Sequence, residues 1–118
     1  MAQVAAIEAL KSGEVSAKEM VEDYNRRRLV MVKGLNDIGL PCFKPKGAFY
    51  AFPSIKGTGM TSEEFAEKLL IKEKVAVVPG TAFGQCGEGY VRCCYATSLA
   101  EIEEALLRMG RFVKKHKK

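Results

Sequence analysis

Apolar residues recur at helical spacing in several stretches of the chain. The first, AQVAAIEALKSG at residues 2–13, is rich in alanine and predicts a short helix. It ends at Ser12 and Gly13, a pair typical of a helix stop and a candidate hinge. A second helix is expected to follow this break.

The second helical stretch is the longest. Ser16 with Glu19 matches a capping box, which favours a helix start at Ser16. The helix is expected to run toward Gly39. Its apolar stripe is formed by Val21, Tyr24, Met31 and Leu35.

Two more helices are predicted in the second half of the chain. Thr61 with Glu64 forms a capping box, and the residues expected to face inward from this helix are Phe65, Leu69 and Leu70. Ser98 with Glu101 begins the last helix. Its apolar face comprises Leu99, Ile102, Leu106, Met109 and Val113.

Three short strands lie between these helices. They are predicted in GAFYAFP (residues 47–53), in KVAVVPG (residues 74–80) and in the stretch from Tyr90 to Tyr95. The resulting order is two helices, a strand, a helix, two strands and a helix. This order predicts an α+β fold with a small, mainly antiparallel sheet and helices packed mostly on one face.

Arg92 stands in the third of these strands. Strand residues alternate between faces, so Arg92 shares one face with Tyr90 and Cys94, opposite the apolar face. One interpretation is a solvent-exposed ion pair with a surface carboxylate. The other is a preorganised site for a carboxylate ligand, since a guanidinium can donate two parallel hydrogen bonds to a carboxylate. The strand pattern leaves both open.

Size and charge limit the classes of function. With 118 residues and 47% hydrophobic residues, the chain can bury one core and should be a single globular domain. The formal charge of +5 comes from the stretch RFVKKHKK, residues 111–118, because the rest of the chain has 14 basic and 14 acidic residues. A basic helix end is favoured by the helix dipole, so we expect this tail to be solvated. Nucleic-acid binding is disfavoured.

The four cysteines do not form a metal-binding pattern. They stand at positions 42, 86, 93 and 94 without CxxC spacing, and we expect free thiols, two or three of them in or near the core. No signal peptide and no apolar run of membrane-spanning length is seen, so we expect a cytoplasmic protein that does not bind a membrane.

Four stretches, taken in order, resemble one family. They are AQVAAIEAL, YNRRRLVMVKGLNDIGL, KPKGAFYAFP and VVPGTAFGQCGEGYVRCCYATS. Together they are similar to the C-terminal small domain of the class I aminotransferases, which are pyridoxal-phosphate enzymes of fold type I. The resemblance covers almost the whole chain, and it implies that residues 1–15 form the end of a connecting helix and residues 16–118 form the small domain.

The resemblance implies roles for four residues. Arg92, in the GYVR motif, would bind the α-carboxylate of an amino acid substrate. Gly47, Phe49 and Tyr50 match a segment that approaches the substrate side of the active site. Packing of the strand is the alternative interpretation of those three residues.

The resemblance also implies a larger enzyme. Family members hold pyridoxal 5'-phosphate through a lysine and other groups of a large domain, whose motifs do not occur in this sequence. The complete enzyme would be a homodimer that exchanges an amino group between an amino acid and a 2-oxo acid, with aspartate, alanine or aromatic donors all open. We expect no catalytic residue in this chain and no activity of the chain alone. The principal alternative is a carboxylate-binding module without catalysis.

Overall fold

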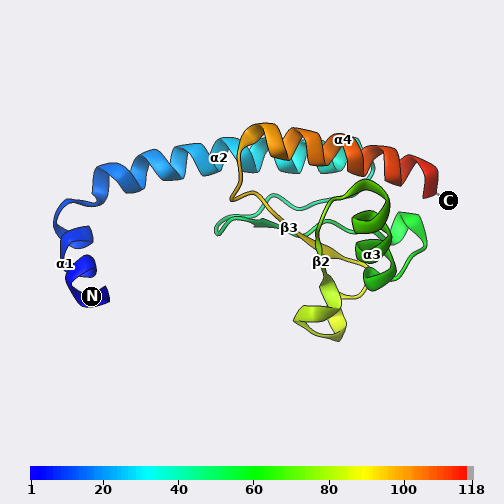
Figure 1. The fold of residues 1–118 in the computed structure, drawn as a ribbon, viewed down its shortest axis with the longest axis horizontal. Coiled ribbons are helices and arrows are strands. Elements are labelled where there is room, and N and C mark those ends of the chain that lie inside the picture. Colours follow the sequence, from blue (N-terminus) through cyan, green and yellow to red (C-terminus); the bar gives the residue numbers. More distant parts are fainter. Residues whose placement is uncertain (117–118) are drawn as a thin grey trace.

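A computed structural model describes residues 1–116. Lys117 and Lys118, the last residues of the predicted basic tail, lie outside the described residues. Two helices, α1 (Ala2–Ser12) and α2 (Glu14–Asp37), come first, and α2 lies beside the C-terminal helix α4 (Leu99–His116) along the top of the molecule in Figure 1. Between α2 and α4 the chain forms helix α3 (Ser62–Glu73) and three strands.

Only Gly13 separates α1 from α2, and the chain bends sharply there (Figure 1). The backbone N–H of Ala17 donates to the carbonyl of Gly13 at 2.9 Å, so helical bonding resumes immediately after the bend. Ser16 therefore lies inside α2, and the predicted start at a Ser16–Glu19 capping box is wrong. Because α2 starts at Glu14, the N–H groups that the Ser16 side chain would cap already donate to carbonyls within the helix.

The buried residues of helix α2 lie in its second half. Met31 and Leu35 are buried and Tyr24 packs against the core, as predicted from the apolar stripe. Val21 is 66% exposed, so its predicted burial is wrong for this chain. The first half of α2 extends beyond the sheet (Figure 1), and Val21 borders an open groove that Gly47 and Tyr95 also line.

The sheet has three short antiparallel strands in the order β1-β3-β2. They are β1 (Tyr50–Ala51), β2 (Val78–Pro79) and β3 (Val91–Cys94). The predicted α+β class and the antiparallel sheet are confirmed, but the two outer strands are much shorter than expected. Strand β2 ends at Pro79, which has no N–H group to donate to a neighbouring strand. Before β1, the positive φ of 57° at Ala48 takes the chain out of an extended conformation.

The core lies between the sheet and the helices. From β3 and the residue after it, Val91, Cys93 and Tyr95 point into the core and are at most 5% exposed. They meet side chains of α2, α3 and α4, which include Leu35, Phe65, Leu69, Ile102, Met109 and Phe112. The helices thus cover one face of the sheet, as predicted, and leave the other face to carry polar groups.

Helix α3 begins with the predicted capping box, in which the Thr61 side chain accepts from the Glu64 N–H and Glu64 accepts from the Thr61 N–H. Phe65 and Leu69 are buried as expected, whereas Leu70 is 49% exposed. Leu70 lies about 100° further around the helix than Leu69, which turns it away from the core.

Helix α4 begins after Ser98, whose Oγ accepts from the N–H of Glu101 at 3.3 Å. Four of the five residues predicted for its apolar face, Ile102, Leu106, Met109 and Val113, are buried, and Leu99 is half-buried. Phe112 is also fully buried, which was not predicted, and its ring packs edge-to-face on Phe65 with centroids 5.3 Å apart.

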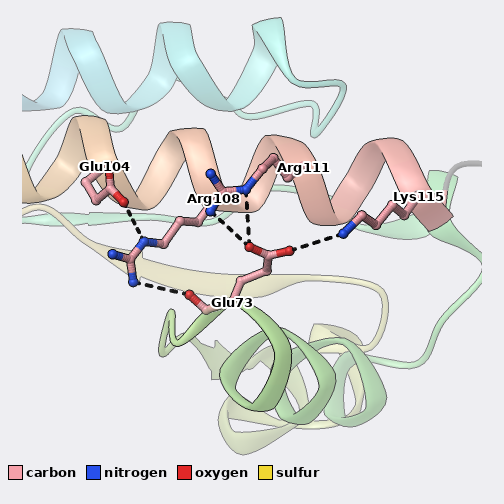
Figure 2. A network of polar contacts seen from close by, with 5 residues as sticks. All are labelled: Glu73, Glu104, Arg108, Arg111 and Lys115. Atoms are coloured by element: carbon pink, nitrogen blue, oxygen red, sulfur yellow. Dashed lines mark hydrogen bonds and ion pairs between the residues drawn. The ribbon is translucent and has the colours of Figure 1, made fainter.

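Polar contacts tie the end of α3 to α4 (Figure 2). The Glu73 carboxylate accepts from Arg111 at 3.2 Å and lies 3.8 Å from the Lys115 ammonium. Arg108 donates to Glu104 at 2.6 Å and to the Glu73 carbonyl at 3.4 Å. Part of the basic tail is therefore engaged in ion pairs rather than merely solvated. No helix among residues 1–116 has the length and apolar composition needed to cross a membrane.

Candidate functional site

Arg92 lies in the middle strand of the sheet, on the face away from the helices. Its neighbours in β3 point into the core, so the alternation predicted for this strand is confirmed. Arg92 lies opposite Val78 in β2, while β1 pairs with the other edge of β3. The central position fixes the backbone of Arg92 from both sides.

Two aromatic rings contact the guanidinium of Arg92. Its Cζ atom lies 4.2 Å from the centroid of the Tyr50 ring and 4.6 Å from that of the Phe83 ring. Both distances are typical of cation–π contacts. We call Tyr50 and Phe83 the aromatic pair. Among the described residues no carboxylate lies within 4.0 Å of this guanidinium, so the surface ion pair considered for Arg92 is not formed.

Tyr50 and Phe49 extend this aromatic surface. The rings of Phe49 and Tyr50 are 4.5 Å apart, and Phe49 in turn stacks on Tyr24 of α2 at 6.1 Å. The structure therefore brings one sequence-predicted residue, Tyr50, into contact with Arg92, while a second, Phe49, packs on Tyr50 and on α2.

Gly47 is placed differently. It lines a shallow groove between α2 and residues 46–48, whose other walls include Tyr24, Arg28 and Tyr95. Arg28 donates a hydrogen bond to the Pro45 carbonyl at 2.6 Å, which holds this segment against α2. Arg92 is not part of the groove.

Phe83 was missed by the sequence reasoning. It ends a short 3-10 helix, η2 (Gly80–Phe83), directly after β2. The available signal was a large apolar residue in a glycine-rich loop next to the arginine strand. Such a residue has no core to enter and must pack on the surface of the site.

The loop that carries Phe83 is held by close backbone contacts. Gly80 donates its N–H to the Tyr90 carbonyl at 2.9 Å, and Gly80 and Gly87 are too close for any side chain to fit between them. Ser62, fully buried at the start of α3, accepts from the N–H of Gly89 at 2.9 Å. The entrance to β3 is thus fixed to both β2 and α3.

The cysteines do not build a metal site. All four are free thiols, and no group of three or more candidate metal ligands is found in residues 1–116. Burial raises the pKa of Cys93 to about 12, so its thiol is protonated and inert at neutral pH. Cys94 is exposed on the face that carries Arg92.

Comparison with known proteins identifies the family. Residues 1–109 match the model of the family described as aminotransferase class I and II. The chain belongs to this family. The resemblance inferred from the four motifs is therefore confirmed.

Similar proteins include several aminotransferases. The chain is 60% identical to YugH of Bacillus subtilis, a protein assigned to the aminotransferases, and 52% identical to an aspartate aminotransferase of Pyrococcus abyssi. Each match covers 98% of this chain and 30% of the relative. The structure superposes on that of an aromatic aminotransferase from Pyrococcus horikoshii with a TM-score of 0.90 and 54% identity, covering 96% of this chain and 31% of the other. The chain thus spans about 30% of the length of these relatives, a share suited to one small domain of an aminotransferase.

Proposed function

We propose that this chain forms the C-terminal small domain of a pyridoxal-phosphate-dependent aminotransferase and that Arg92 binds the α-carboxylate of its substrates. Such an enzyme moves an amino group from an amino acid to a 2-oxo acid. Both substrates carry a carboxylate next to the reacting carbon, so one arginine can serve in both half-reactions. The chain alone supplies binding and orientation but no catalytic residue.

The observation that carries this proposal is the environment of the Arg92 guanidinium. Arg92 is half-buried on a central strand, its Cζ atom lies over two aromatic rings, and no carboxylate of the described residues forms an ion pair with it. A cation in this setting retains its hydrogen-bonding capacity for a ligand. The N–H groups at the edge of the guanidinium match the two oxygens of a carboxylate.

Residues 1–116 do not fit the role of cofactor holder. Pyridoxal phosphate is bound through an imine to a lysine whose pKa must be lowered, which requires burial or a neighbouring cation. The described lysines are exposed, apart from the half-buried Lys68, which pairs with Glu64. In the proposed enzyme the cofactor is therefore held by polypeptide outside this chain. When bound, it would stabilise the negative charge that develops at the substrate Cα.

The bend at Gly13 supports a role in domain movement. Helix α1 has no buried residue, and the bend lies two residues before the end of the segment 1–15 expected to be a connecting helix. We propose that α1 belongs to the connection with a large domain and that rotation at Gly13 brings Arg92 over the substrate. Closure would remove water from the bound carboxylate and strengthen its contact with the guanidinium.

The names of two similar proteins indicate two classes of amino donor. One similar protein is an aspartate aminotransferase and another is an aromatic aminotransferase. We propose aspartate or an aromatic amino acid as the donor, and a cytoplasmic homodimer as the form of the complete enzyme.

The proposal is tested with Arg92→Lys in the full-length protein that carries residues 1–118. Lysine keeps the charge but cannot donate two parallel hydrogen bonds, so the KM of the amino donor and the Kd of a dicarboxylate inhibitor should both rise by about 10-fold or more. The absorption spectrum of the bound cofactor should not change. Arg26→Lys, at an exposed arginine of α2, is the matched control.

The alternatives give different results. If Arg92→Lys leaves both constants unchanged, Arg92 does not bind the substrate carboxylate. If residues 1–118 bind amino acids but the full-length protein neither binds pyridoxal phosphate nor transfers amino groups, the carboxylate-binding module is the correct function.

A further inference from the structure

Phe83 is placed to control the orientation of Arg92. Tyr50 and Phe83 reach the guanidinium from different strands, since Tyr50 belongs to β1 and Phe83 follows β2, and β3 lies between those strands. Each ring centroid is within 4.6 Å of the Arg92 Cζ atom. The guanidinium is thus approached by one ring from each side of its strand.

The position of Phe83 is itself fixed. Its ring packs edge-to-face on Phe52 with centroids 6.0 Å apart, and Phe52 stacks on Tyr90 at 5.7 Å with an interplanar angle of 13°. The backbone of η2 is held against η3 (Gln85–Gly87) by the contact of Gly80 with Gly87. Because the Phe83 ring is held by the Phe52 ring and by the fixed backbone of η2, it can restrain the Arg92 guanidinium that lies against it.

Arg92 needs such a restraint. An arginine side chain has several rotatable bonds and loses conformational entropy when it is fixed in one orientation. None of the hydrogen bonds formed by the described side chains involves the Arg92 guanidinium. The contacts with the two aromatic rings therefore have to orient it, and an aromatic ring does not take up N–H donors as a carboxylate would.

We propose that Phe83 is a positioning residue that, together with Tyr50, orients the Arg92 guanidinium for carboxylate binding before the ligand arrives. The inference rests on the proposed function of Arg92 as the carboxylate-binding residue. Phe83 restrains the guanidinium through its ring face, and the ligand then meets two N–H groups already aligned with its oxygens. Part of the ordering entropy is lost on folding rather than on binding.

The test uses Phe83→Leu and Phe83→Tyr in the full-length protein that carries residues 1–118. Leucine removes the π face but keeps an apolar side chain, and the Kd of a dicarboxylate inhibitor should rise by about 3- to 30-fold. Because donor and transition state share the carboxylate contact, KM should rise with little change in kcat. Tyrosine retains the ring and should restore Kd to within about twofold of the wild-type value.

Phe43→Leu is the matched control. Phe43 is 96% exposed and makes none of the aromatic contacts found among the described residues, so the same substitution there should leave Kd unchanged. An equal rise in Kd for Phe43→Leu and Phe83→Leu would overturn the proposal, because it would show a general effect of lost apolar surface.

The result for Arg92→Lys separates this inference from the proposed function. If Arg92→Lys weakens inhibitor binding and Phe83→Leu does not, Arg92 binds the carboxylate and Phe83 does not position it. If neither substitution weakens binding, the proposed function of Arg92 is wrong.

If Phe83→Leu fails to fold, the proposal is tested by NMR on the wild-type protein. Protons that lie over an aromatic ring are shifted upfield in NMR spectra, so the side-chain protons of Arg92 should resonate upfield of those of the exposed Arg26. Ordinary chemical shifts for Arg92 in the absence of ligand would overturn the proposal.

Discussion

Gly80 and Gly87 meet backbone to backbone, and a Cβ atom on either residue would lie 2.0 Å from the carbonyl oxygen of the other. This contact joins the end of β2 to the turn before β3. It places the loop of η2 and η3 beside the strand that carries Arg92. The geometry of the candidate site therefore depends on a backbone contact between two glycines that carry no side chain.

Gly80→Ala should destabilise the protein strongly. The added methyl group meets backbone atoms that cannot move independently, and we expect a loss of about 1–3 kcal/mol in the free energy of unfolding, or more. Urea denaturation measures the loss. Gly57→Ala is the control, because a Cβ atom at Gly57 would have no neighbour within 4 Å. Equal stability of the two variants would contradict the close contact.

Ser62→Ala should weaken the attachment of this loop to α3. The Ser62 Oγ accepts from the backbone N–H groups of Gly89 and Tyr90, at 2.9 and 3.3 Å, and the residue is fully buried. Alanine leaves the Gly89 N–H without its acceptor, whereas the Tyr90 N–H still donates to the Gly87 carbonyl at 3.2 Å. We expect a cost of about 1–3 kcal/mol. Ser16→Ala, inside α2, should instead be neutral or slightly stabilising, by up to about 0.5 kcal/mol. Thermal unfolding of both variants checks the difference, and a neutral Ser62→Ala would show that water replaces the hydroxyl.

Glu73→Gln should loosen the contact between α3 and α4 (Figure 2). The carboxylate is 10% exposed and faces Arg111 and Lys115, both of which are more than half exposed. Because solvent screens these cations, we expect a loss of only about 1 kcal/mol at low salt. The loss should shrink in about 1 M NaCl, where the Debye length falls to about 3 Å. Glu103→Gln, at an exposed position of α4, should change stability in neither condition. A salt-independent effect of Glu73→Gln would point to packing instead.

Cys93 should make stability decrease at alkaline pH. Burial raises the pKa of its thiol from 9.0 to about 12, so the folded state keeps a proton that the unfolded state releases above about pH 9. This contribution to stability is complete below pH 9 and is lost as the pH rises toward 12. Cys93→Ala should show a smaller fall in unfolding free energy between neutral and alkaline pH. Cys94→Ala, at an exposed thiol, should follow the wild type. Parallel curves for wild type and Cys93→Ala would contradict the burial of this thiol.

Much of the fold follows from local sequence patterns. The alternation of β3 and the apolar faces of α3 and α4 were predicted because period and burial coincide wherever an element lies against the core. The inward positions predicted for Val21 and Leu70 were wrong because the same patterns do not show how far the core extends along or around a helix. The helix start predicted at Ser16 was wrong because a Ser-x-x-Glu sequence can also occur inside a helix. The two helices are separated at Gly13 instead.

The candidate site was predicted only in part. Arg92 and Tyr50 were found from the strand and from the family motif, and they lie in contact. Gly47 lies in a separate groove, since the bend at Ala48 directs it away from the sheet. Phe83 was not found because a large apolar residue in a glycine-rich loop does not show which side chain it will contact. The contact of Gly80 with Gly87, which sets the path of this loop, is not visible in the sequence pattern.

The middle strand has a consequence for how the site could change. Val91 and Cys93 enter the core only because Arg92, between them, points the other way. A slip of β3 by one residue would bury the guanidinium and expose its apolar neighbours, which would cost far more than any binding energy could restore. No folded variant of this domain can therefore hide Arg92 by shifting the strand. If β3 did shift, the domain would unfold and carboxylate binding would be lost with it. Carboxylate affinity therefore also reports whether β3 keeps its register in the sheet.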